Sequence, residues 1–208
     1  MALYHLFLIA VIQGVTEFLP ISSSGHLILL PNLSGLEDQG LVIDVAVHVG
    51  TLFAVMLYFW RDVSVAAAGS LRLLRGKVDT PGAFLALCLI VATVPVVIAG
   101  VAIKATGLDA ALRSTAVIGW TMLVFGLVLY WFDQKSPVTR KAGEWTLKHA
   151  LVMGLWQVLA LIPGTSRAGI TITGARALGY TRHDGAKLAM LMSIPTIAMA
   201  GLLLAVDV

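Results

Sequence analysis

The 208-residue chain is 59% hydrophobic and 12% charged, with a formal net charge of +3 and a mean hydropathy of +0.94. This composition excludes an ordinary water-soluble domain and indicates an integral membrane protein. The basic residues form no stripe interleaved with aromatic residues, so the sequence predicts no nucleic-acid partner. The single cysteine, Cys88, excludes an intramolecular disulfide and a thiolate metal cluster.

Four apolar stretches of about 20 residues are long enough to cross a hydrocarbon core of about 30 Å as helices. They lie near residues 41–60, 83–103, 114–132 and 186–206. We therefore expect an all-α fold, a polytopic membrane helix bundle that forms a single integral-membrane domain over residues 1–208.

Basic residues cluster in segments 61–82 and 133–148, whereas segment 104–113 carries only two. The positive-inside rule places the first two segments in the cytoplasm, as loops, and the third outside. The apolar N-terminus precedes the first basic residue, Arg61, so we expect it to belong to the mature fold rather than to a cleaved signal peptide.

The first polar string, QGVTEFLPISSSGH, runs from Gln13 to His26. A carboxylate in an apolar hairpin costs several kcal/mol unless it is paired, protonated or metal-bound, so Glu17 indicates function. The alternative is that Glu17 caps the helix expected to begin near Ser22. Gln13 lies one helical turn before Glu17, and together they could hold a hard divalent cation, Mg²⁺ or Ca²⁺.

The serine-rich turn of this string offers amides and hydroxyls to an anion at a helix N-terminus, or is only a flexible turn. Its candidate anion-binding residues are Ser22, Ser23, Ser24 and Gly25. His26 could act as a general base toward a serine or attack phosphorus itself, and the sequence does not choose between these roles. A histidine packed in the bundle interior is the alternative.

The second polar string, PGTSRAGIT, runs from Pro163 to Thr171. The planar guanidinium of Arg167 fits two phosphate oxygens, and its alternative role is a structural salt bridge to Glu17. Further candidates for binding the anion are Gly164, Thr165, Ser166 and Thr171. The hydroxyls of this group could instead bond to carbonyls of their own helix.

Pro20 and Pro163 interrupt apolar runs before these are long enough to cross a membrane, so each string is expected to form the tip of a re-entrant helix hairpin. The hairpins are expected over about 1–36 and 149–182. Irregular backbone at membrane depth needs protein or a water-filled cavity around it, so a cavity is also expected.

The two strings resemble one another, since Gln13 precedes Pro20 by seven residues and Gln157 precedes Pro163 by six. This spacing predicts an inverted-topology repeat, with repeat 1 over about 1–140 and a partial repeat 2 over about 141–208. The first unit continues with two more spans. We therefore expect an intact second unit to extend by roughly 70 residues past Val208, so that this chain lacks the last two helices.

Asp44 and His48 form another i, i+4 pair, at the outer end of the expected span 41–60. Such a pair is more typical of residues that cap and hydrate a helix end than of residues that carry chemistry.

Taken together, the two strings resemble the signatures of the undecaprenyl-pyrophosphate phosphatase family, also called the bacitracin-resistance family. The likeness extends through residues 44–51 and 193–196. It implies a multi-pass protein of the bacterial inner membrane that removes the terminal phosphate from undecaprenyl diphosphate. It also implies a divalent-cation requirement, an active site that faces the periplasm, and a polyprenyl diphosphate and membrane lipid as partners. The oligomeric state stays open and includes a homodimer.

The resemblance implies an acidic motif of Glu17 and Gln13, and at the position of Gln13 the family often has a second Glu. It implies that Ser23 and His26 belong to the Ser-Gly-His turn. The Arg motif then contains Ser166, Arg167 and Thr171. The expected mechanism is that Arg167 and a Glu17-bound cation neutralise the diphosphate while His26 or Ser23 attacks, directly or through water. A lipid-phosphate transporter or flippase with the same headgroup site is the alternative function.

Overall fold

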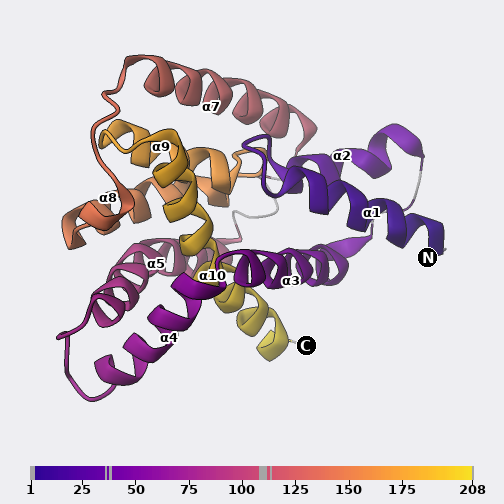
Figure 1. Ribbon diagram of the computed structural model, residues 1–208. Helices are drawn as coiled ribbons and strands as arrows, with labels where there is room; N and C mark the ends of the chain where they lie inside the picture. Colours follow the sequence, from indigo (N-terminus) through magenta and orange to yellow (C-terminus); the bar gives the residue numbers. More distant parts are fainter. Residues whose placement is uncertain (1–2, 36, 38, 108–111, 113, 208) are drawn as a thin grey trace.

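The chain folds into helices joined by turns, as the sequence predicts (Figure 1). The computed structural model describes residues 3–207 except 36, 38, 108–111 and 113. Val208, where the expectation about missing helices applies, lies outside the described residues. The longer helices are α1 (Leu3–Thr16), α2 (Ser23–Ser34), α3 (Gly40–Tyr58), α4 (Trp60–Leu73), α5 (Pro81–Thr106), α7 (Thr115–Lys135), α8 (Leu147–Val158), α9 (Arg167–Ala177) and α10 (Arg182–Asp207).

Three of the four predicted membrane spans are helices long and apolar enough to cross a bilayer: α5, α7 and α10, the last over Arg182–Leu203. The remaining predicted span, near 41–60, corresponds to α3, but the chain does not continue from it into a loop. After Tyr58 it bends by 95° into α4, as in a broken span or a re-entrant loop. Most of the predicted loop 61–82 is therefore helical.

Two glycines allow helix α4 to lie directly on α5. Gly69 of α4 is buried, and a Cβ atom placed there would overlap the backbone of Gly82, in the first turn of α5. A Cβ atom on Gly82 would in turn overlap the carbonyl of Val65. The two helices thus pack backbone against backbone, a contact that a count of apolar residues does not predict.

Replacing Gly69 with alanine is expected to lower the free energy of unfolding by roughly 1–3 kcal/mol, because α4 must move away from α5. Thermal unfolding in detergent, followed by circular dichroism, measures the change. Gly119→Ala in α7 is the matched control, since no atom of the described residues outside that helix lies within 4 Å of the added methyl group. Equal melting temperatures for the two variants would contradict the contact.

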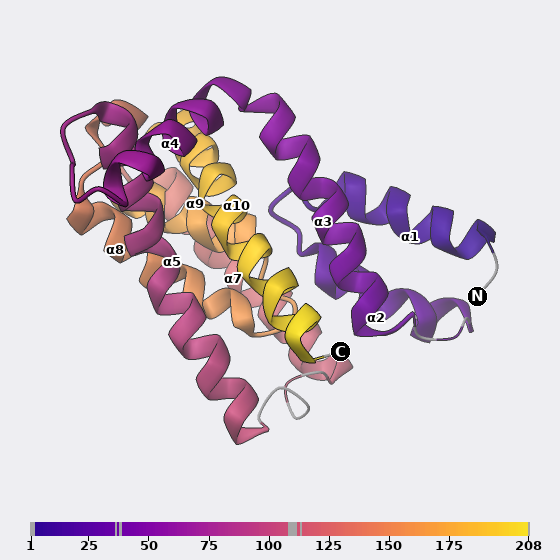
Figure 2. The same cartoon turned by 90° about the horizontal axis from the view of Figure 1, so that it is seen from below.

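The helices are arranged around a central pair, α3 and α10, which pack against each other (Figure 2). Helices α1 and α2 pack together on the α3 side, and α8 and α9 pack together beside α10. A cluster of buried apolar side chains lies between α5, α8, α9 and α10 and includes Leu89, Met153 and Met192. On α7, by contrast, large apolar side chains such as Trp120 and Leu127 are exposed, as expected for a helix that faces lipid.

Both predicted helix breaks are present. Between α1 and α2 the chain turns through Pro20, and between α8 and α9 it passes through a 3₁₀ turn, Leu159–Leu161, and then Pro163. The two turns meet at the centre of the molecule (Figure 1). A Cβ atom on Gly169 would lie 3.3 Å from Cβ of Pro20, so the glycine lets the start of α9 approach the first turn.

Candidate functional site

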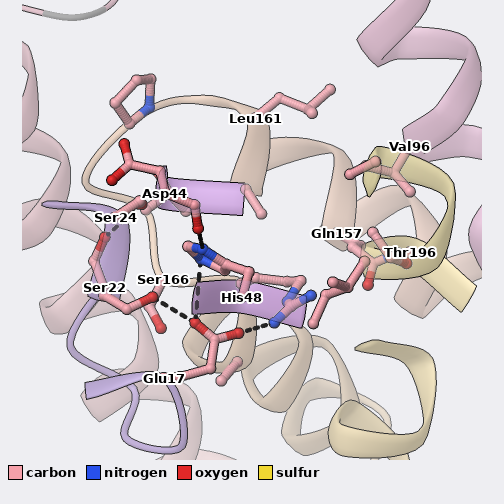
Figure 3. A pocket seen from close by; sticks show the side chains of 18 of the residues that line it. Glu17, Ser22, Ser24, Asp44, His48, Val96, Gln157, Leu161, Ser166 and Thr196 are labelled. Atoms are coloured by element: carbon pink, nitrogen blue, oxygen red, sulfur yellow. Dashed lines mark hydrogen bonds and ion pairs between the residues drawn. The ribbon is translucent and has the colours of Figure 1, made fainter. Parts of the chain in front are cut away.

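The two polar strings meet at Glu17, which is 8% exposed and lies just beyond the end of α1 (Figure 3). Arg167, the first residue of α9, donates from Nη2 to Glu17 Oε1 and forms an ion pair with it. The second oxygen, Oε2, accepts from Ser23 Oγ at 2.5 Å and from Gln13 Nε2 at 3.1 Å. A buried carboxylate needs such partners, because an unpaired buried charge costs several kcal/mol.

The serine before α2 and the serine before α9 each cap their helix with a side-chain hydrogen bond. Ser22 caps α2 and its Oγ accepts from the amide of Gly25 at 3.2 Å, while Ser166 caps α9 and its Oγ accepts from the amide of Gly169 at 3.1 Å. Ser22 has φ of +66°, a left-handed conformation that costs energy for a non-glycine residue. Both helices therefore start at the site, where their N-termini favour an anion.

A cavity of about 450 Å³ lies between the two strings. Its polar lining comes from both hairpins and from α3 and α10: Glu17, Ser22, Ser23, Ser24, Asp44, His48, Gln157, Thr165, Ser166, Arg167 and Thr196. Apolar residues line the rest, among them Ile28, Val96 and Ile197. The cavity can thus hold a molecule that is charged at one end and apolar at the other.

Five residues predicted at the site lie outside the lining of this cavity. Gln13 is fully buried behind Glu17. His26 Nδ1 lies 2.8 Å from the carbonyl oxygen of Ser22, to which it donates, and Thr171 Oγ1 donates to the carbonyl of Arg167 within its own helix. The other two are Gly25 and Gly164, and Gly164 lines a smaller, separate cavity of about 180 Å³.

His48 is the residue that sequence reasoning missed, because the pair with Asp44 resembles a helix cap. The structure places it in the cavity, with Nε2 3.5 Å from Glu17 Oε2. The available signal was the histidine itself, since an ionisable side chain within a membrane span is a functional candidate by default. Its direction toward Glu17 depends on how α3 packs against α1.

Two buried polar atoms on cavity-lining residues have no hydrogen-bond partner among the described residues. They are Oε1 of Gln157 and Oγ1 of Thr165, on side chains 0% and 2% exposed. Buried polar atoms are normally satisfied by protein, water or ligand.

The oxygen donors near Glu17 are of the type that Mg²⁺ and Ca²⁺ prefer. Gln13 Oε1 is buried with no hydrogen-bond partner in the part of the chain that the structure describes, and Asp44 lines the same cavity as Glu17. Within the described ranges, however, no group of three or more His, Cys, Asp or Glu residues could enclose a metal ion. The residues fit a cation that phosphate oxygens and water help to coordinate.

Comparison with known proteins gives consistent matches. The sequence pattern of the family described as "Bacitracin resistance protein BacA" matches residues 6–208. An undecaprenyl-diphosphatase from Dinoroseobacter shibae is 74% identical over 208 residues, which are all of this chain and 78% of that protein. Those from Ruegeria pomeroyi and Maricaulis maris are 67% and 48% identical, over 100% and 97% of this chain and 78% and 75% of theirs.

Proposed function

This chain belongs to the bacitracin resistance protein BacA family, and on that premise we propose that it is an undecaprenyl-diphosphatase. The reaction hydrolyses undecaprenyl diphosphate to undecaprenyl phosphate and inorganic phosphate, which recycles the lipid carrier of cell-wall synthesis. The observation that carries the proposal is the pairing of Glu17 with Arg167 across two hairpins, at the polar end of a partly apolar cavity.

The cavity suits this substrate in charge and polarity. The guanidinium of Arg167 has five N–H donors, and its contact with Glu17 uses only Nη2. The remaining donors and the N-termini of α2 and α9 favour a diphosphate. The apolar part of the lining, which includes Ile28 and Val96, accommodates the start of a polyprenyl tail.

We further propose that the two hairpins are re-entrant and related by an inverted repeat. A matched pair of contacts supports this. Gln13 Nε2 of α1 donates to Thr51 Oγ1 of α3 at 3.3 Å, and Gln157 Nε2 of α8 donates to Thr196 Oγ1 of α10 at 3.1 Å. Each hairpin is thus tied through a glutamine to a threonine of the long helix that follows it. A bacterial inner-membrane location with a periplasmic site belongs to the same proposal.

For the chemistry, we propose that Ser23 attacks the terminal phosphorus while Glu17 Oε2 takes its proton, because their 2.5 Å hydrogen bond already aligns that transfer. The new Ser23–phosphorus bond forms as the bond to the lipid phosphate oxygen breaks, and water then releases inorganic phosphate. A divalent cation, Mg²⁺ or Ca²⁺, would be held by Glu17 and would neutralise phosphate charge when bound. His26, whose Nδ1 binds the Ser22 carbonyl, holds the start of α2 in this scheme.

The test is phosphate release from undecaprenyl diphosphate by the purified chain in detergent, with and without chelator. We expect release that falls when divalent cations are removed and returns when Mg²⁺ or Ca²⁺ is added. A lipid-phosphate transporter or flippase, the alternative function, needs a sealed bilayer and releases no phosphate in detergent. Binding of the lipid without any release would therefore favour the transporter.

A further inference from the structure

His48 is held in one orientation at the edge of the cavity. Its Nδ1 lies 2.6 Å from the backbone carbonyl oxygen of Asp44, one turn earlier in α3. A carbonyl oxygen only accepts hydrogen bonds, so Nδ1 carries the hydrogen. The opposite ring nitrogen, Nε2, is thereby the atom that His48 presents to its surroundings, and it donates to a carboxylate only in the imidazolium form, which carries a hydrogen on both ring nitrogens.

What Nε2 faces is the catalytic carboxylate. It lies 3.5 Å from Glu17 Oε2, and the His48 side chain is 23% exposed while that of Glu17 is 7% exposed (Figure 3). The other groups that contact Glu17 come from α1, α2 and α9, through Gln13, Ser23 and Arg167. His48 adds a contact from α3, on the side where the carboxylate borders the cavity.

From this geometry we infer that His48 is a positioning residue for Glu17, an inference that rests on the proposed function. Oε2 of Glu17 is the oxygen that receives the Ser23 proton in the proposed reaction. As an imidazolium, His48 donates from Nε2 to that oxygen from α3, so that the oxygen stays aligned with Ser23 instead of rotating into the cavity. Supports of this kind are typically worth 10- to 100-fold in activity.

The direct test compares His48→Ala with His48→Gln. We expect the alanine variant to lose about 10- to 100-fold in kcat for phosphate release with KM within about twofold of the wild type, since an interaction that orients the reacting group is lost. Glutamine places an amide donor near the position of Nε2 and should restore most of kcat. A rise in KM with kcat unchanged would overturn the inference, because His48 would then bind the lipid headgroup itself.

A double-mutant cycle with Glu17→Gln separates positioning from a general structural role. If His48 acts through Glu17, His48→Ala should change phosphate release by less than twofold in the Glu17→Gln background, measured in single turnover with enzyme in excess. Fully additive losses would contradict the inference. The exposed His183→Ala, at the start of α10, is the matched control and should keep wild-type kinetics. If the wild type itself released no phosphate, the proposed function would fail, and this role with it.

Discussion

Replacing Arg167 with alanine is expected to lower kcat/KM for undecaprenyl diphosphate by about 10³-fold or more, measured as phosphate release in detergent. The guanidinium lines the cavity at the start of α9 and is the cation that the structure places against Glu17. It would stabilise the charge of the phosphoryl group in the transition state. Arg167→Lys keeps the charge but not the planar fork, so its loss should be smaller yet still clear.

The same substitution leaves the carboxylate of Glu17 buried without its ion-pair partner, which destabilises the fold. Activity and stability can be separated by the double variant Arg167→Ala with Glu17→Gln, which removes the uncompensated charge. We expect the double variant to unfold at nearly the wild-type temperature while it remains inactive. Arg75→Ala, in the exposed basic turn after α4, is the arginine control. Phosphate release by Arg167→Ala close to the wild-type rate would contradict the mechanism.

The helix breaks of both hairpins could be predicted from sequence because their causes are local. Proline within an apolar run removes a backbone donor and clashes with the preceding turn, which favours a break near Pro20 and Pro163. Proline alone does not decide it, since Pro95 and Pro195 lie inside α5 and α10. The contact between Glu17 and Arg167 spans 150 positions of sequence. From the sequence, this ion pair could be given only as one of two roles for Arg167. A buried charge needs a partner, but the sequence does not identify that partner.

The bend into α4 and the role of His48 depend on tertiary packing and escaped prediction for that reason. Counting basic residues identifies the side of the membrane, but it does not distinguish a loop from a surface helix such as Trp60–Leu73. The backbone contact of Gly69 with Gly82 requires that α4 already lies on α5. Likewise, the periodicity of α3 does not show that His48 faces α1 rather than lipid.

Arg176 is a second residue whose importance only the structure reveals. It is 0% exposed, in the last turn of α9, and its guanidinium donates five hydrogen bonds. Their acceptors are Oδ1 of Asp133 and the carbonyl oxygens of Asp133, Ser136, Pro137 and Tyr180. The side chain therefore connects the C-terminal end of α9 to the end of α7 and to the segment that follows α7.

Arg176→Ala is expected to lower the free energy of unfolding by about 3–5 kcal/mol, because it removes all five hydrogen bonds of a fully buried guanidinium. Thermal unfolding in detergent would show this as a large fall in melting temperature. Lysine at this position retains the charge but cannot serve five acceptors in a fixed plane, so Arg176→Lys should recover only part of the loss.

The control is Arg182→Ala, because Arg182 also pairs with Asp133, at 2.8 Å, but its side chain is 64% exposed. An exposed ion pair contributes about 0–1 kcal/mol, so this variant should unfold close to the wild type. Equal destabilisation by the two alanine variants would mean that the ion pair with Asp133, rather than the hydrogen bonds of Arg176 to the carbonyl groups, stabilises the second hairpin.

If the hydrogen bonds to the carbonyl groups do stabilise the hairpin, Arg176→Ala should also lower phosphate release at temperatures below its melting transition. The reason is that Arg167 lies at the start of α9, the helix whose last turn Arg176 holds in place.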